Sequence, residues 1–423
     1  MEVGCDEIAF AKQTSNYSKL FLLFGILAPM PILNVFSITM YVWGILILGI
    51  IALSECIRKC SVKICFKNDN AFMFVICTWI ISYLICFFRM PVKWTKGLLT
   101  SFVQLCFLVI VYVFFSQKSK IDCFVYYVKG VYISSVVQMV WGFAQIFFEK
   151  IGKNLNDLIF RETFHMIKGY ATQYQFGKLK VSGLCWNAGN LAPLLTFGYI
   201  YTHNTFVKIS IFVLGFLSGS RTLMIGLIIA TVIQVIISLN PKIKISRKKV
   251  LLLLIGIAIV SVIIVININA LMEKSMEIIQ LLDIKNRVKT EGSASTHLYY
   301  WTSIPEITHK NNLISNLFGY GPGCSGYPQS HLMNFYATSD KWSIECDYVN
   351  QLWSYGYIGF VIYYYWYLKN VLKMIKIDKR YLILFATFLF EGVLYNITFN
   401  WVLFLILSIF TLQKSGIDMF NYK

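Results

Sequence analysis

The sequence predicts an all-α polytopic membrane protein, and three observations lead to this prediction. Of the 423 residues, 57% are hydrophobic and the mean hydropathy is +0.64. Only 14% are charged, whereas soluble domains carry roughly 25%. The apolar residues fall in blocks of about 15 to 25, the length of helix that crosses a bilayer. The whole chain, 1–423, is expected to form one integral membrane domain.

We expect about twelve membrane spans, because that many apolar blocks follow one another along the chain. Pro29 and Pro31 interrupt the first span, and the sixth and seventh are short and closely joined. The predicted ranges are 20–35, 37–55, 71–88, 98–115, 123–148, 189–203, 206–219, 221–239, 250–270, 347–368, 381–396 and 398–413.

The basic charge predicts the orientation of these spans. A net charge of +18 in a soluble protein would suggest a nucleic-acid partner, but here much of it lies in short loops between apolar blocks. Three loops near 58–67, 242–249 and 369–380 are rich in Lys and Arg, and twelve spans put all three on one side. By the positive-inside rule that side is the cytoplasm, together with both termini, and no nucleic acid is expected.

Two long connections, about 149–189 and 271–346, then lie outside. Long ordered loops are more often functional than merely connecting, so the active face is expected there. The larger loop begins with a predicted amphipathic helix over 271–288. The stretch "GSASTHLYYW" follows, in which Ser295 or Thr296 would cap a short helix that carries His297 and Trp301. A glycine-rich segment, "NLFGYGPGCSGYPQSH", ends at His331, and its glycines permit close backbone approach to a ligand.

Two carboxylates, Glu345 and Asp347, stand at the start of the span predicted for 347–368. Acids at this depth are costly without partners or water. They can be a general base, a metal pair, or acids favoured by the helix dipole at a solvated N-terminus. The sequence leaves these alternatives open.

Cations on the outer side have no role in setting topology. Arg221 lies inside "GFLSGSRTLMIGLIIA", and Arg287 lies in the larger loop. Arginine donates two hydrogen bonds to one phosphate, so these cations are candidates for an anionic ligand. Contacts to lipid headgroups are the alternative. The other outer cations are Arg89, Lys93, Lys96, Arg161, Lys168, Lys178 and Lys180.

Four segments in this order resemble the O-antigen and capsule polymerase family (Wzy-type), which is related to the O-antigen ligases. "KVSGLCWNAGNLAP" is similar to the family's basic-x-S-G-hydrophobic-x-x-N segment, which here ends at Asn187, and "FLSGSRTLMIG" is similar to its S-x-S-R-T segment. "GSASTHLYYW" with "LFGYGPG" resembles the start of its large outer loop. "ECDYVNQLWSYGYIGF" resembles the end of that loop. The resemblance covers roughly residues 178–360.

Two positions depart from the family pattern. Many relatives have Arg where this chain has His297, so that basic role is weaker here or moves to Arg287. Many ligases and some polymerases have His at the position of Glu345, whereas others, often capsule or O-antigen polymerases, have an acid. Glu345 therefore favours a polymerase over a ligase.

The resemblance implies a GT-C-like glycosyltransferase in the bacterial cytoplasmic (inner) membrane, with its active site facing the periplasm or exterior. It would move the growing glycan from undecaprenyl diphosphate to the next lipid-linked repeat unit, with inversion and without metal or cofactor. A chain-length regulator and a flippase are the implied partners, besides membrane lipids.

The resemblance also assigns roles to residues. Cations would stabilise the leaving diphosphate, with Arg221 first and Arg161, Lys178, Lys180, Arg287 and Asn187 as further substrate-binding candidates. The base would be Glu345 or Asp347, followed by His297 and His331. An O-antigen ligase and a lipid-linked oligosaccharide flippase are the competing functions. Flippases usually have repeated halves and charges inside the membrane, which this sequence does not show clearly.

Overall fold

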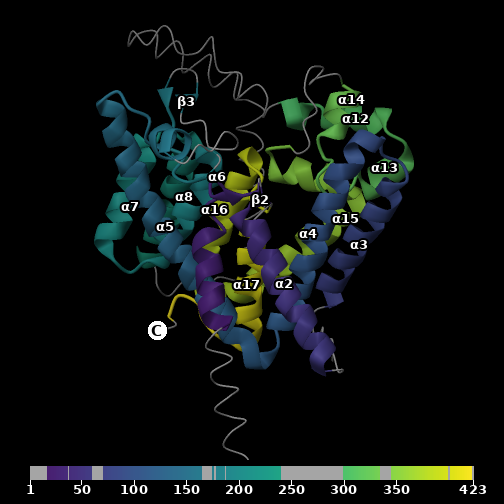
Figure 1. The fold of residues 1–423 in the computed structure, drawn as a ribbon, viewed down its shortest axis with the longest axis horizontal. Coiled ribbons are helices and arrows are strands. Elements are labelled where there is room, and N and C mark those ends of the chain that lie inside the picture. Colours follow the sequence, from purple (N-terminus) through teal and green to yellow (C-terminus); the bar gives the residue numbers. More distant parts are fainter. Residues whose placement is uncertain are drawn as a thin grey trace, which may run out of the picture.

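The computed structural model shows a bundle of α-helices with very little β-structure (Figure 1). The chain is therefore an all-α membrane-embedded protein, as the sequence predicts. The described residues are 17–36, 38–59, 70–163, 174–175, 178–185, 187–239, 299–333, 344–398 and 401–421.

Each predicted span that these residues cover contains a helix. A first apolar helix, Tyr17–Leu27, precedes the labelled elements. The long helices of the bundle are α2 (Met40–Lys59), α3 (Asn70–Phe87), α4 (Val92–Phe115), α5 (Ile121–Lys150), α6 (Ala188–Tyr201), α7 (Thr205–Leu217), α8 (Arg221–Leu239), α15 (Asp347–Met374), α16 (Arg380–Leu394) and α17 (Trp401–Ser415).

Short elements complete the described chain. Three short helices belong to the larger predicted loop, where the sequence also places short helices. The short elements are β1 (Asn34–Val35), β2 (Ile38–Thr39), η1 (Lys118–Lys120), η2 (Asp157–Thr163), β3 (Tyr174–Gln175), β4 (Lys178–Leu179), α12 (Ile304–Lys310), α13 (Leu313–Phe318) and α14 (Tyr327–His331).

The number of membrane spans is not settled by helix length. Within the described residues, four helices are long and apolar enough to cross a membrane: Met40–Arg58, Asn70–Phe87, Trp94–Phe115 and Lys118–Lys150. Several others are apolar but shorter, and the span predicted for 250–270 lies outside the described residues. The count of about twelve therefore stays a prediction.

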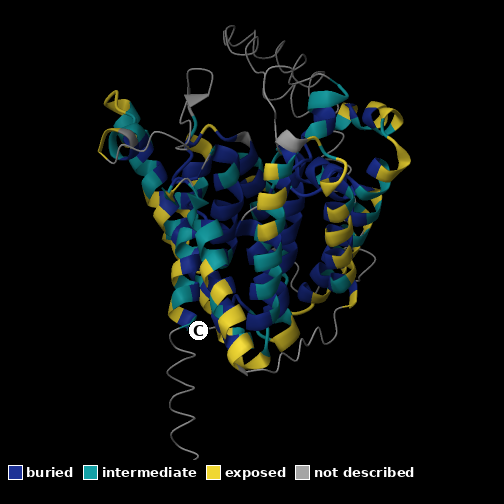
Figure 2. Cartoon of the chain, turned by 45° about the vertical axis from the view of Figure 1, so that its right-hand side comes forward, coloured by how far each residue is buried: buried dark blue, intermediate teal, exposed yellow. Residues whose placement is uncertain are grey.

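The outer faces of the helices are apolar, as lipid contact requires. Figure 2 shows buried residues through the middle of the bundle and less buried ones along its sides. On α3, Phe74 and Leu84 are exposed, and on α7, Phe206 and Ile209 are exposed. A soluble protein rarely leaves so many large apolar side chains in water, which supports the membrane assignment.

The first predicted span is wrong at its C-terminal end. The helix ends at Leu27 rather than near residue 35, because Pro29 and Pro31 lack the N–H groups that a helix needs. The chain then forms the two-stranded hairpin β1–β2, with Val35 opposite Ile38.

Elements of both long predicted loops lie at one end of the bundle, which we call the loop end. Figure 1 shows β3, α12, α13 and α14 there, with the C-terminus toward the opposite end. The opposite end holds a buried ion pair, in which Lys120 Nζ lies 2.8 Å from Glu55 Oε2. The Lys120 ammonium also lies 3.5 Å from the centre of the Phe114 ring, so the ion pair and this cation–π contact join α2 to the α4–α5 turn.

Helix α15 is broken at Gly356, where φ is 67° and ψ is −176°. The break leaves the carbonyls of Trp353 and Ser354 without helical partners. The N–H groups of Tyr320 and Gly321 bond to them at 2.7 and 2.8 Å. The loop after α13 thereby replaces the hydrogen bonds that the helix loses, which is the condition for irregular backbone at membrane depth.

We expect Gly356→Ala to destabilise the protein by roughly 3 kcal/mol or more, from a strained backbone and a steric clash. A Cβ at Gly356 would lie 2.3 Å from the backbone carbonyl of Leu317. Gly152 has a similar φ of 72° but nothing within 4 Å of its Cβ position, so Gly152→Ala is the matched control. Thermal unfolding in detergent measures both, and equal losses would contradict the proposed packing.

Candidate functional site

Three helices begin at the loop end, and each begins at a segment singled out in the sequence. Helix α6 starts after Asn187, α8 starts at Arg221 and α15 starts at Asp347. The first N–H groups of a helix have no intrahelical partner, and the dipole makes this end positive. This end of the bundle therefore offers several partial positive charges from the backbone alone.

Asn187 is the N-cap of α6. Its side-chain oxygen accepts a hydrogen bond from the N–H of Asn190 at 2.8 Å, which is the usual role of Asn at this position. The predicted substrate-binding residue thus also has a structural role, because it sets where α6 begins.

The "KVSG" and "SGSRT" segments are in direct contact. The N–H of Val181 donates to the carbonyl of Ser218 at 2.9 Å, and Ser220 Oγ accepts from the N–H of Leu223 at 3.4 Å, near the start of α8. The side chain of Arg221 is outside the described part of the structure, but its backbone is the first residue of α8. Two of the four resembling segments therefore meet at the loop end.

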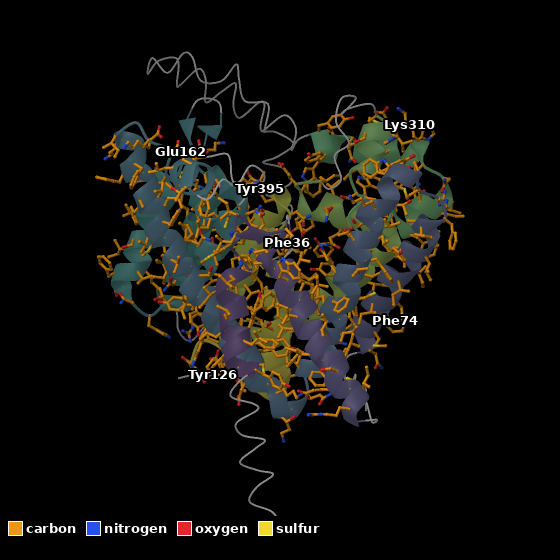
Figure 3. All side chains as sticks on the ribbon, viewed as in Figure 1. Phe36, Phe74, Tyr126, Glu162, Lys310 and Tyr395 are labelled. Atoms are coloured by element: carbon orange, nitrogen blue, oxygen red, sulfur yellow. The ribbon has the colours of Figure 1, made fainter. Side chains whose placement is uncertain are left out.

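Tyr395, in the turn between α16 and α17, connects these segments with the acidic one. Figure 3 shows Tyr395 at the loop end, between the two halves of the bundle. A Cβ added to Gly189 would lie 1.9 Å from the Tyr395 ring, so the ring packs directly on the start of α6. Burial, and secondly the charge of Glu345, raise the pKa of the Tyr395 phenol to about 12. At neutral pH the phenol is protonated and can donate a hydrogen bond.

A pocket opens beside this junction. It has about 480 Å³ of space, and Gly189, Asn190 and Asn396 are among the residues that line it. Two amide side chains and the first turn of α6 thus line this pocket, part of which is open to solvent.

The two acids that the sequence could not separate have different surroundings. Asp347 is 2% exposed, and its carboxylate accepts three hydrogen bonds from other residues. Oδ1 accepts from the N–H of Thr398 at 3.1 Å and also from the Thr398 hydroxyl, and Oδ2 accepts from Tyr364 Oη at 3.0 Å. Glu345 is only half-buried. Asp347 therefore ties α15 to the α16–α17 turn, whereas part of Glu345 is exposed.

The larger loop packs against the same region through Trp301. Its ring lies 5.8 Å from that of Tyr348, and its indole N–H donates to the carbonyl of Val393 at 3.4 Å. Residues 299–302 are helical, as expected, while the predicted capping residues Ser295 and Thr296 lie outside the described residues.

Glu391 is a candidate that the sequence analysis missed. It is fully buried on α16, and its Oε1 accepts a hydrogen bond from Thr196 Oγ1 of α6 at 2.8 Å. A Cβ at Gly226 of α8 would lie 2.6 Å from the same Oε1. One carboxylate thus lies between three helices that reach the site. The signal was a lone acid within an apolar span, which is a reason to consider a functional position.

The structure places the remaining predicted residues as follows. Lys180 is half-buried, directly before Val181. His331 ends α14, stacks on Tyr327 with ring centres 4.2 Å apart and faces Trp94 at 5.6 Å. For Arg161, in η2, and Lys178, in β4, only the backbone is described, and His297 and Arg287 lie outside the described residues.

The described residues contain no group of three or more His, Cys, Asp or Glu side chains that could hold a metal ion. A metal-independent reaction stays a prediction.

Comparison of the chain with models of protein families gives no match, and comparison with curated proteins gives none either. The resemblance to the O-antigen and capsule polymerase family therefore rests on the four segments themselves.

We expect Asp347→Asn to lower stability by about 1–3 kcal/mol, because an amide NH2 would face a hydroxyl or N–H donor and leave it unsatisfied. Tyr364→Phe, which removes one of the three hydrogen bonds, should cost about 1 kcal/mol. Thermal unfolding in detergent compares the two variants with the unmodified protein. A fully stable Asp347→Asn protein would rule out the structural role of Asp347.

Proposed function

We propose that the protein is an O-antigen or capsule polymerase that transfers a growing glycan from undecaprenyl diphosphate to the next lipid-linked repeat unit. The observation that carries this proposal is that the four resembling segments reach one end of the bundle and contact one another in two pairs. Val181 of the first segment bonds to Ser218 of the second, and Tyr320 of the third bonds to Trp353 of the fourth. Gly189 of the first segment also packs on Tyr395, in the turn after α16.

The leaving group of this reaction is a diphosphate. As the bond from the anomeric carbon to the diphosphate oxygen breaks, the electron pair stays with the diphosphate and its negative charge grows. Positive groups fixed beforehand around that charge stabilise the transition state. We assign this role to Arg221 at the start of α8, with Lys180 beside it in the contacting segment and the helix N-termini as further support.

The acceptor hydroxyl must lose a proton as its oxygen attacks the anomeric carbon. We assign this proton to the Glu345 carboxylate, because Glu345 is half-buried while Asp347 is buried and holds three hydrogen bonds. The Tyr395 phenol, protonated and close enough for the Glu345 charge to raise its pKa, lies at the same place. Asp347 and Glu391 are positioning residues, because they hold α15, α6, α8 and α16 together.

Deletion of the gene tests the reaction class. A strain without a polymerase should carry surface glycan that is capped at a single repeat unit. A flippase or ligase deletion should remove surface glycan altogether. Gel separation of extracted glycan gives the chain lengths, and normal long chains in the deletion strain would refute the proposal.

Substitutions of Arg221 and Glu345 test the assigned roles. Arg221→Ala and Glu345→Gln should each lower the amount of long-chain glycan at least about 100-fold, the usual cost of losing one transition-state contact. Lys310 and Glu306 form an exposed ion pair at 2.7 Å on α12, so Lys310→Ala and Glu306→Gln are the matched controls and should leave chain length unchanged.

Complementation of the deletion strain, with immunoblots for protein level, measures all four variants. Full-length glycan in a strain that carries Arg221→Ala would remove Arg221 from the site.

A further inference from the structure

A second pocket lies beneath the break in α15. Residues from α3, α4, α15 and α17 line it, and it has about 620 Å³ of space, part of which is open to solvent. Thr398, whose hydroxyl donates to Asp347, is part of its wall, so the pocket adjoins the start of α15.

Three polar atoms of the residues that line this pocket make no hydrogen bond of normal geometry within the described part of the chain. They are the Trp79 indole nitrogen, the Gln351 side-chain oxygen and the Tyr363 hydroxyl, and the last of these lies near the Thr398 side chain. Trp79 and Tyr363 are each 1% exposed, and Gln351 is 6% exposed. A buried polar group without a partner is costly, and lipid offers none. Three such atoms around one pocket indicate that a polar molecule occupies the pocket.

The chemistry of the wall restricts what this occupant is. Trp79 offers a donor, Gln351 an acceptor and Tyr363 a hydroxyl that can do both. Gln104 and Asn350 add amide groups, and no described residue of the wall is charged. Such a wall suits an uncharged molecule with several hydroxyl groups, and it gives a diphosphate no cation.

Aromatic rings form one part of the apolar wall, and Leu105, Leu108 and Leu403 form another. The rings of Trp79 and Tyr355 lie 5.5 Å apart, tilted by 32°, and both residues line the pocket. A sugar ring has hydroxyl groups at its edge and C–H groups on its faces. It can therefore hydrogen-bond to the polar side chains of the wall and pack against the aromatic rings.

Gln351 connects the pocket to the acidic segment. Its side-chain nitrogen donates to Thr398 Oγ1 at 2.7 Å. Its side-chain oxygen points away from Thr398 and accepts no hydrogen bond from the described residues. Thr398 in turn donates to Asp347. A ring held by Gln351 therefore lies beside the segment in which Glu345 stands two residues before Asp347.

We propose that this pocket binds one uncharged sugar ring of the glycan and so selects the repeat unit that the protein accepts. The identity of the ligand as part of a lipid-linked glycan rests on the proposed function. Recognition of a hydroxyl-rich ring rests only on the pocket.

Binding of simple glycosides tests the pocket. The probes are the methyl glycosides of glucose, galactose, mannose and N-acetylglucosamine, added to the full-length protein in nanodiscs. Saturation-transfer difference NMR detects weak binding. At least one glycoside should give a transfer signal, and both Gln351→Leu and Tyr363→Phe should reduce that signal at least fivefold.

The control is Gln413→Leu. Gln413 also has an unpartnered side-chain oxygen, but it lies near the C-terminal end of α17, away from the pocket. This variant should bind as the unmodified protein does. If Gln351→Leu does not fold, the binding test rests on Tyr363→Phe, because this substitution removes only one oxygen atom and disturbs the packing least. Absence of any transfer signal, or a signal that both pocket variants keep, would overturn the proposal.

This outcome is independent of the test of polymerisation. Glycoside binding with normal chain length in the deletion strain would keep the sugar pocket and reject the polymerase. Absence of glycoside binding, together with single-unit glycan in the deletion strain, would support the polymerase and reject the sugar pocket.

Discussion

The contact between Gly319 and Gly356 is the constraint on which the site depends. Both residues have positive φ, and a Cβ on either one would collide with the backbone of the other segment. The two backbones approach closely enough for Tyr320 and Gly321 to bond the carbonyls that the break in α15 exposes. The break in α15 and the loop after α13 therefore fit each other, and Ser354 and Tyr355 beside the break line the polar pocket.

Buried carboxylates organise the rest of the loop end. Glu391 lies between α6, α8 and α16. Asp347 ties the start of α15 to Thr398 and to Tyr364, which lies beyond the break in the same helix. Each is surrounded by helices that carry a residue of the proposed site, and each costs free energy to bury unless it is bonded. Glu345 differs, because it remains half-buried. These acids therefore differ in burial rather than in residue type.

Much of the fold could be predicted from the sequence. Every predicted span within the described residues contains a helix, and the elements of the two long loops share one end of the bundle (Figure 1). The end of the first span was misplaced, since the pattern of apolar residues continues past Pro29 while the backbone cannot. Glu391 was missed because one acid hardly changes the hydropathy of a span.

Apolar block length and the placement of Lys and Arg determined, by themselves, a helical membrane protein. In lipid each peptide group must find its hydrogen-bond partner within its own segment or an adjacent one. Local composition is therefore enough to predict membrane-spanning helices. Only the tertiary structure decided that Asp347 is enclosed and that α15 breaks at Gly356. It also decided that Trp79, Gln351 and Tyr363 surround one pocket. These features depend on contacts between segments far apart in the chain, such as Gly319 with Gly356 and Gly189 with Tyr395, which no local pattern records.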